Sequence, residues 1–147
     1  MKWVAWLEIL FFGDYIVKAI KDLRFESFTP VQKEVLDDMK LNKNILAKSK
    51  TGSGKTHAFL IPIFQSLDEK KYNVQATILA PTKELAMQIY KVAQHIASFS
   101  GDRIDIKLYS GGTDRLKEIA KLSNNQPQIV NNFNLKGESI QILLLTE

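Results

Sequence analysis

Residues 44–56 read NILAKSKTGSGKT, an apolar run followed by a loop of small residues and the start of a helix. The short apolar run over Asn44–Ala47 favours a buried strand, and helix-compatible residues continue from Lys55 to Gln65. The chain must therefore reverse through residues 49–54, which form a glycine-rich loop. Glycine lets a backbone approach an anion closely, and a helix N-terminus attracts negative charge. The stretch therefore predicts a loop that wraps a phosphate group.

The end of this loop carries candidate nucleotide ligands. Lys55 is placed to reach the β- and γ-phosphates of a nucleotide, and the Thr56 hydroxyl is a candidate ligand for Mg²⁺. The general phosphate-loop pattern G-x-x-x-x-G-K-[ST] expects a glycine at position 49, where this chain has Ser49. For the loop taken alone, an ordinary glycine-rich turn between a strand and a helix is the alternative.

Length and composition fit one globular domain. The chain has 147 residues, of which 45% are apolar and 24% are charged. Its net charge of +4 favours anionic partners such as nucleotide phosphates or RNA, without requiring them. Cysteine is absent, which excludes disulfides and thiolate metal sites, and the two separated histidines argue against a zinc site. We therefore expect a protein of the reducing cytoplasm.

The apolar opening, residues 3–12, has about the length of the apolar region of a signal peptide. Glu8 interrupts it, no cleavage site of the A-x-A kind follows, and the run is too short to span a bilayer. We therefore expect a soluble chain with no membrane partner.

Hydrophobic periodicity predicts alternating helices and strands along the rest of the chain. Helices are expected over 15–23 with Asp14 as N-cap, from Thr29-Pro30 onward, over 83–99 and over 113–122; strands are expected over 75–80 and 104–109 and from 128–130 onward. This alternation implies right-handed crossovers and a parallel sheet with helices on both faces, which is the α/β class. The pattern breaks at Asn131: residues 131–137 look like a loop, and residues 139–145 fit one more strand.

Four stretches, in this order, resemble motifs of the first RecA-like domain of the DEAD-box RNA helicases. Phe25, Thr29, Pro30 and Gln32 resemble the adenine-reading Q motif; AKSKTGSGKT at 47–56 resembles motif I, where a small residue is normal at position 49; PTKELA at 81–86 resembles motif Ia, with Lys for Arg; and SGG at 110–112 resembles the GG motif. The resemblance covers about residues 14–130. It implies an incomplete RecA-like P-loop NTPase domain with Q-motif helices over 14–41, a core over 44–130 and a divergent tail over 131–147.

The same resemblance implies ATP and Mg²⁺ as cofactors and RNA as partner. The implied nucleotide-binding residues are Phe25, Thr29, Pro30, Gln32, Ser49, Thr51, Gly52, Ser53, Gly54, Lys55 and Thr56, and Thr56 is also the implied Mg²⁺ ligand. The implied contacts to the sugar-phosphate backbone of single-stranded or duplex RNA are Pro81, Thr82, Lys83, Gly111 and Gly112. Such binding should be independent of sequence and sensitive to salt.

The chemistry of individual residues agrees with this resemblance. A glutamine side chain offers a donor and an acceptor in one plane, which matches the N6/N7 edge of adenine, so Gln32 is the candidate for selecting ATP over GTP. The alternative for Gln32 is an exposed glutamine on a helix, and the alternative for Phe25 and Phe28 is packing in the core. At residues 81–83 a strand end meets a helix N-terminus, whose free N–H groups suit a phosphate; a plain helix start is the alternative.

Some motifs of the resembled family do not occur in these 147 residues. After residues 128–130 the family continues with a Thr-Pro-Gly-Arg-like motif, then Asp-Glu-Ala-Asp, which holds Mg²⁺ and positions the attacking water, and then Ser-Ala-Thr. The family also has a second domain, whose arginine reaches the γ-phosphate; in other enzymes such an arginine raises the rate roughly 10³–10⁵-fold. Without those carboxylates and that arginine, we expect negligible ATP hydrolysis. Arg24 also stands where the family usually has glycine, and no adenine-stacking aromatic aligns clearly within residues 3–12.

Several functions remain open from the sequence. The chain can be the ATP-binding and RNA-binding portion of a helicase, a non-catalytic nucleotide-binding or RNA-binding module, or an inert fragment of a truncated or frame-disrupted gene product whose sheet edges are left exposed. A small P-loop kinase is a more distant alternative.

Overall fold

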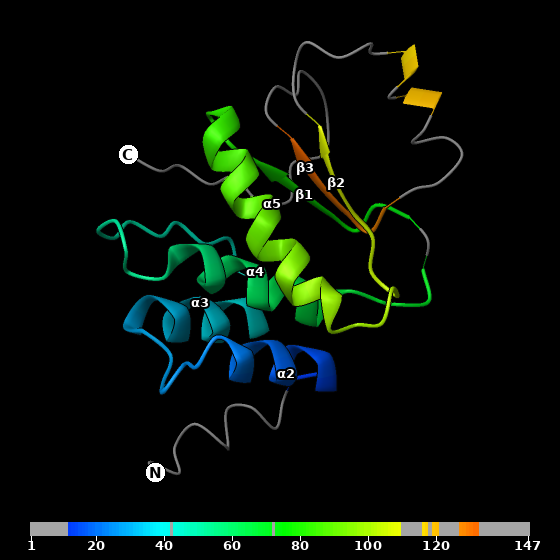
Figure 1. Cartoon of the computed structure of the whole chain (residues 1–147). Helices are drawn as coiled ribbons and strands as arrows, with labels where there is room; N and C mark the ends of the chain where they lie inside the picture. Colours follow the sequence, from blue (N-terminus) through cyan, green and yellow to red (C-terminus); the bar gives the residue numbers. More distant parts are fainter. Residues whose placement is uncertain are drawn as a thin grey trace. The chain divides into compact units, whose positions relative to one another are not determined.

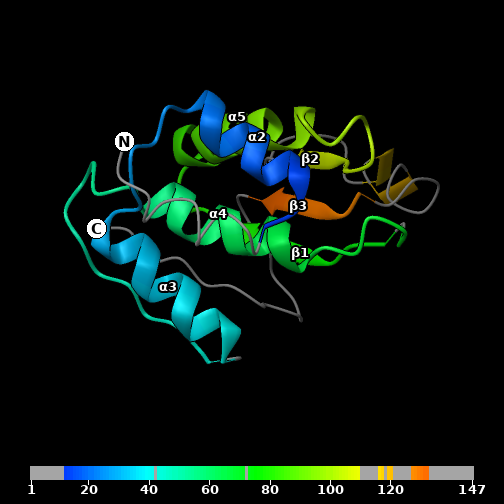
Figure 2. The same ribbon diagram turned by 90° about the horizontal axis from the view of Figure 1, so that it is seen from below.

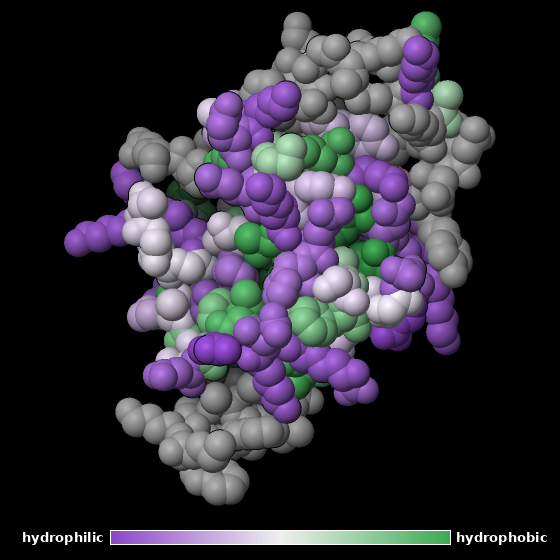
Figure 3. Space-filling model, in the orientation of Figure 1, coloured by the Kyte–Doolittle hydropathy of each residue, from purple (hydrophilic) through white to green (hydrophobic). Residues whose placement is uncertain are grey.

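The computed structural model describes residues 12–41, 43–71, 73–109, 116–117, 119–120 and 127–132. The chain divides into two compact units, Met1–Ser66 and Leu67–Glu147, and each is described by itself (Figure 1). Hydrophilic side chains predominate among the described residues on the face shown in Figure 3. No helix in these described ranges is long and apolar enough to cross a membrane.

The first unit contains three helices, α2 (Asp14–Asp22), α3 (Pro30–Lys40) and α4 (Lys55–Ser66). Helix α4 contacts both of the others and lies between them in Figure 2. Helix α2 is held to α4 by Tyr15, whose hydroxyl donates a 2.8 Å hydrogen bond to the carbonyl oxygen of Phe64 and whose ring meets the Phe64 ring edge-on. The N-cap of α2 is Gly13, so the prediction of Asp14 as cap was wrong by one residue. Asp14 instead occupies the first turn, where its charge favours the helix dipole.

The predicted start of α3 is confirmed. Thr29 is the N-cap and Pro30 is the first helical residue, where its fixed φ and missing N–H cost nothing. The Gln32 side chain reaches back to accept a 2.9 Å hydrogen bond from the Thr29 N–H. These local signals explain why the helix begins here and why Gln32 points toward the start of its own helix.

The predicted strand over Asn44–Ala47 is wrong, because residues 43–50 form no strand. Burial still alternates along the segment: Ile45 is half-buried, whereas Leu46 is 85% exposed. An alternating pattern makes a strand possible, but a strand forms only when a neighbouring strand takes up its backbone hydrogen bonds. Within the described residues, every strand pairing involves the second unit's own three strands.

The second unit contains β1 (Ala76–Leu79), α5 (Lys83–Ser98), β2 (Ile106–Tyr109) and β3 (Ile129–Asn132). The strands form one parallel sheet in the order β1-β3-β2, and α5 packs on β2 and β3. Ile129 of the central strand lies level with Ala76 on one side and Ile106 on the other. The α/β class and the parallel sheet are thus confirmed.

Strand β3 runs two residues beyond its predicted end. Asn131 and Asn132 continue the ladder, so the loop expected from Asn131 was wrong at these positions. The reason is that a central strand is hydrogen-bonded on both sides, which outweighs the low strand propensity of asparagine. Of the helix predicted over 113–122, residues 116–117 and 119–120 are described and are helical. The turn predicted at 110–112 and the strand predicted at 139–145 lie outside the described residues.

A buried glutamine connects the segments that lead into the strands of this sheet. Gln128, only 2% exposed, accepts a 2.8 Å hydrogen bond at Oε1 from the Asp105 N–H. Its Nε2 donates to the carbonyl oxygens of Lys71 (3.3 Å) and Arg103 (3.2 Å). Because both ends of the buried amide are hydrogen-bonded, Gln128 ties the segments before β1 and β2 to the start of β3.

Candidate functional site

The glycine-rich loop turns through two glycines with left-handed backbone conformations. Gly52 and Gly54 have φ values of +78° and +89°, in a region that glycine enters without steric cost. The loop closes through a 3.3 Å hydrogen bond from the Ser53 N–H to the Lys50 carbonyl oxygen. Helix α4 then begins at Lys55, so the free N–H groups of its first turn adjoin the loop. The predicted passage from loop to helix is confirmed.

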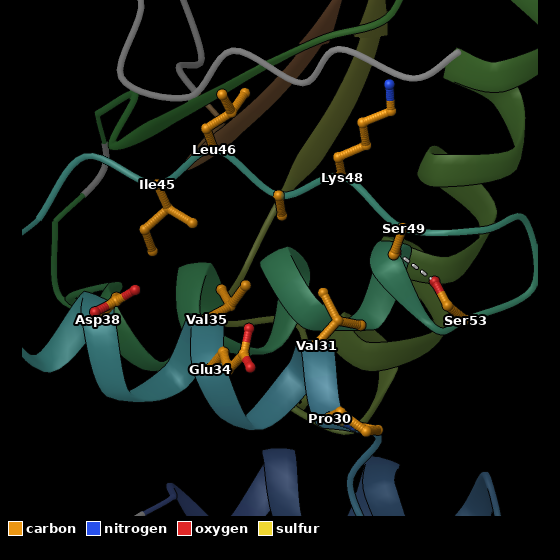
Figure 4. A pocket seen from close by; sticks show the side chains of 11 residues that line it. Pro30, Val31, Glu34, Val35, Asp38, Ile45, Leu46, Lys48, Ser49 and Ser53 are labelled. Atoms are coloured by element: carbon orange, nitrogen blue, oxygen red, sulfur yellow. Dashed lines mark hydrogen bonds between the residues drawn. The ribbon is translucent and has the colours of Figure 1, made fainter.

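Side chains also cross the loop. Lys55 Nζ donates a hydrogen bond to the Ser49 carbonyl oxygen, which brings the ammonium group back to the loop's first residue. The hydroxyl groups of Ser49 and Ser53 share a 2.6 Å hydrogen bond, which is the dashed line in Figure 4. Thr56 follows in the first turn and is half-buried, whereas Thr51 at the loop tip is exposed. A phosphate at this loop would therefore meet backbone N–H groups, two hydroxyls and one ammonium group.

Gln32 joins helix α3 to the loop. The side chain is 2% exposed, and its Nε2 donates a 3.2 Å hydrogen bond to the Gly54 carbonyl oxygen. A Cβ atom at Gly54 would lie 2.6 Å from Gln32 Nε2 and 3.3 Å from Thr29 Oγ1. The alternative of an exposed helical glutamine is therefore wrong. Position 54 requires glycine for two reasons, its positive φ and the close approach of the Gln32 amide.

The two aromatic residues before α3 have different surroundings. Phe28 is buried and meets the Phe12 ring edge-on at 6.0 Å, which fits the core-packing alternative. Phe25 is half-buried, and its ring lies 5.1 Å from the ring of His57 at an interplanar angle of 81°. Arg24, just before it, has φ +54° and follows the last turn of α2. That left-handed conformation is the physical reason for the glycine that the resemblance led us to expect there.

A cavity of about 400 Å³ lies between α3 and the segment after it (Figure 4). In the figure, Ile45 is directed toward α3 and Leu46 away from it. The cavity is lined by Pro30, Val31, Glu34, Val35, Asp38, Ile45, Leu46, Ala47, Lys48, Ser49 and Ser53. Only Pro30, Ser49 and Ser53 among these were predicted to bind nucleotide. Sequence reasoning missed the cavity, because nothing in the local pattern says which segment lies over α3.

In the second unit, Pro81, Thr82 and Lys83 lie together at the start of α5, and all three are exposed. Thr82 is the N-cap, and its Oγ1 accepts a 3.2 Å hydrogen bond from the Leu85 N–H. The predicted meeting of a strand end with a helix N-terminus is thus confirmed, while the RNA contacts remain predictions. Gly111 and Gly112 lie outside the described residues.

The described part of the chain holds no cluster of three or more His, Asp or Glu side chains that could bind a metal by themselves.

A family model described as DEAD/DEAH box helicase matches residues 29–137. The chain belongs to the DEAD/DEAH box helicase family. The match takes in α3, the glycine-rich loop and every described strand, so the two units carry parts of one family domain. Among curated relatives, the DEAD-box ATP-dependent RNA helicase CshB of Staphylococcus aureus is 38% identical over 115 residues, which make up 78% of this chain and 25% of the relative.

Solved structures of DEAD-box helicases agree with the fold. Mss116, bound to single-stranded RNA and UDP-BeF, matches with a TM-score of 0.75 at 35% identity over 86% of this chain and 27% of that one. Saccharomyces cerevisiae Dbp5, in a complex that includes ADP, matches with a TM-score of 0.70 at 25% identity over 83% of this chain and 31% of that one. The described fold is therefore part of a RecA-like domain, and the chain spans about a quarter of the length of the curated relatives it matches.

Proposed function

We propose that these residues form the ATP-binding and RNA-backbone-binding portion of a DEAD-box RNA helicase. The observation that carries the proposal is the hydrogen bond from Gln32 to Gly54, because it joins the adenine-reading segment of this family to the loop that would hold phosphates. A base and a polyphosphate bound there would then be held by one connected structure.

In this proposal the phosphates lie against the loop of Ser49, Thr51, Gly52, Ser53 and Gly54 and the first turn of α4. Lys55 exchanges its carbonyl partner, Ser49, for phosphate oxygens, which make stronger charge-assisted hydrogen bonds. The Thr56 hydroxyl supplies one oxygen to Mg²⁺. Phe25, Thr29, Pro30 and Gln32 hold the base. Bound ATP would supply the transferable phosphoryl group.

RNA binding is proposed at the start of α5. The exposed Lys83 and the N-terminal N–H groups of this helix suit phosphate groups, and Gly111 and Gly112 would allow a backbone to come close. The relative Mss116, which was solved with bound single-stranded RNA, supports RNA as the partner. Duplex RNA is a further candidate partner, and the cytoplasm is the proposed compartment.

We further propose that these 147 residues neither hydrolyse ATP nor unwind RNA by themselves, since the sequence contains no Asp-Glu-Ala-Asp. A non-catalytic nucleotide-binding or RNA-binding module is the second candidate function. Both candidates share the proposed lack of hydrolysis, which is tested by steady-state release of phosphate with and without RNA. Turnover that Lys55→Ala abolishes would contradict the proposed lack of hydrolysis.

Nucleotide binding is tested by thermal unfolding with Mg·ADP and with Mg·GDP. A ligand that binds only the folded chain, at 100 times its dissociation constant, stabilises it by about 2.7 kcal/mol. We expect a higher midpoint with ADP than with GDP, and no shift in Lys55→Ala. Equal shifts with ADP and GDP would remove the adenine preference, and no shift with either would remove the proposed nucleotide site.

A further inference from the structure

His57 connects the phosphate-binding end of α4 to the segment before α3. It is the third residue of α4, directly after Lys55 and Thr56. Successive helical residues are rotated by about 100°, so the three side chains leave the helix in different directions. The His57 ring meets the Phe25 ring at 5.1 Å and 81°, the edge-to-face geometry that aromatic pairs favour.

Phe25 depends on such a contact for a fixed position. Unlike Phe28, which is buried at 7% exposure, Phe25 is only half-buried. It follows Arg24, which comes just after the C-cap of α2 and has a left-handed backbone conformation. A half-buried ring retains more rotational freedom than a core ring, and immobilising a side chain costs free energy at the moment of binding. A contact that already fixes Phe25 removes part of that cost.

We propose that His57 is a positioning residue that sets the affinity of the site for adenine nucleotides by fixing the Phe25 ring. The proposal rests on the proposed function, in which Phe25 contacts the base. It requires that His57 act on the base and not on the phosphates. A polyphosphate without a base must therefore bind independently of His57, although Lys55 and Thr56 adjoin it in the helix.

The test is isothermal titration of the full chain with Mg·ADP and with Mg·pyrophosphate, which lacks the base. In His57→Ala we expect the affinity for ADP to fall roughly two- to tenfold, which corresponds to the typical strength of one aromatic pair. Pyrophosphate affinity should stay within about twofold of the parent, since the loop is untouched. His57→Phe, which keeps an aromatic ring at this position, should recover most of the ADP affinity.

A matched control lies on α5. His95 and Phe99 form a similar edge-to-face pair, at 5.4 Å and 85°, in the other unit. Loss of this pair in His95→Ala should change neither affinity. The proposal is overturned if His57→Ala weakens ADP and pyrophosphate alike, if it changes neither, or if His57→Phe does not recover ADP binding. Should the parent bind pyrophosphate but not ADP, the base site fails and His57 with it; binding of neither overturns the proposed function itself.

Discussion

Substitution of Gly54 by alanine adds only one methyl group, but it should strongly lower the free energy of unfolding. The new Cβ atom would lie 2.6 Å from Gln32 Nε2, a separation that real Cβ contacts essentially never show. The amide of Gln32 must therefore move, although it is buried and bonded at both ends. The backbone at Gly54 also has φ +89°, which a residue with a side chain adopts only under strain.

The magnitude follows from these two costs. A left-handed backbone costs roughly 1–2 kcal/mol for a residue with a Cβ atom, and a buried polar group that loses its partner costs about 1–3 kcal/mol. We therefore expect Gly54→Ala to lower the free energy of unfolding by roughly 2–5 kcal/mol. Gly52→Ala is the matched control, because φ is +78° there but no atom lies within 4 Å of the added Cβ. It should show only the backbone cost.

Urea unfolding of both variants, followed by circular dichroism, measures the two costs. A third variant, Gln32→Ala combined with Gly54→Ala, isolates the clash, because removing the amide makes room for the methyl group. The double variant should be more stable than the sum of the two single changes predicts, by about 1–3 kcal/mol. If Gly54→Ala is no worse than Gly52→Ala, or if the two changes are simply additive, the Gln32–Gly54 junction does not have the role assigned to it.

Three further changes test the residue after the C-cap of α2, the hydrogen bonds at the start of β3 and the proposed RNA-binding surface. Arg24→Gly should raise the free energy of unfolding by about 0.5–1 kcal/mol, because the residue has φ +54°, whereas Arg24→Ala should give no gain in the same denaturant titration. Gln128→Ala should cost roughly 2–4 kcal/mol, since it removes a buried amide together with its three hydrogen bonds to the backbone. Thermal unfolding should show a much smaller loss for Gln75→Ala, whose amide is more exposed. Lys83→Ala should weaken binding of single-stranded RNA equally for unrelated sequences and lower the slope of log affinity against log salt by roughly 0.7; Lys91→Ala, exposed further along α5, should leave both unchanged in fluorescence anisotropy titrations.

The helices were predictable because their signals are local. Thr29 and Pro30 mark the start of α3, and Thr82 marks the start of α5, through contacts within the first turn. Strands were less predictable, since pairing decides them. The apolar run over 44–47 has the composition of a strand but pairs with no described strand, whereas Asn131 lacks strand propensity but lies in the central strand between two partners.

The sequence identified candidate residues of the site, but it did not predict which of them contact one another. Motif spacing picked out Gln32 and Gly54, yet no local pattern states that the amide of one touches the backbone of the other. The hydrogen bonds of Gln128 were even harder to predict, because the sequence indicated only that a strand begins there. A signal was present in retrospect: a polar residue directly before the apolar pair Ile129-Val130 is expected to be buried with them, and a buried amide needs hydrogen-bond partners.

The hydrogen bonds of Gln32 bear on its proposed role in recognising adenine. Its amide group has two N–H protons and two oxygen lone pairs. One proton goes to the Gly54 carbonyl oxygen and one lone pair accepts the Thr29 N–H, so half of the capacity is already used within the chain. These two bonds fix the plane and the orientation of the amide, because exchanging its O and N would set like against like at both partners. The remaining proton and lone pair therefore point in fixed directions, which is what a site needs in order to distinguish one base edge from another.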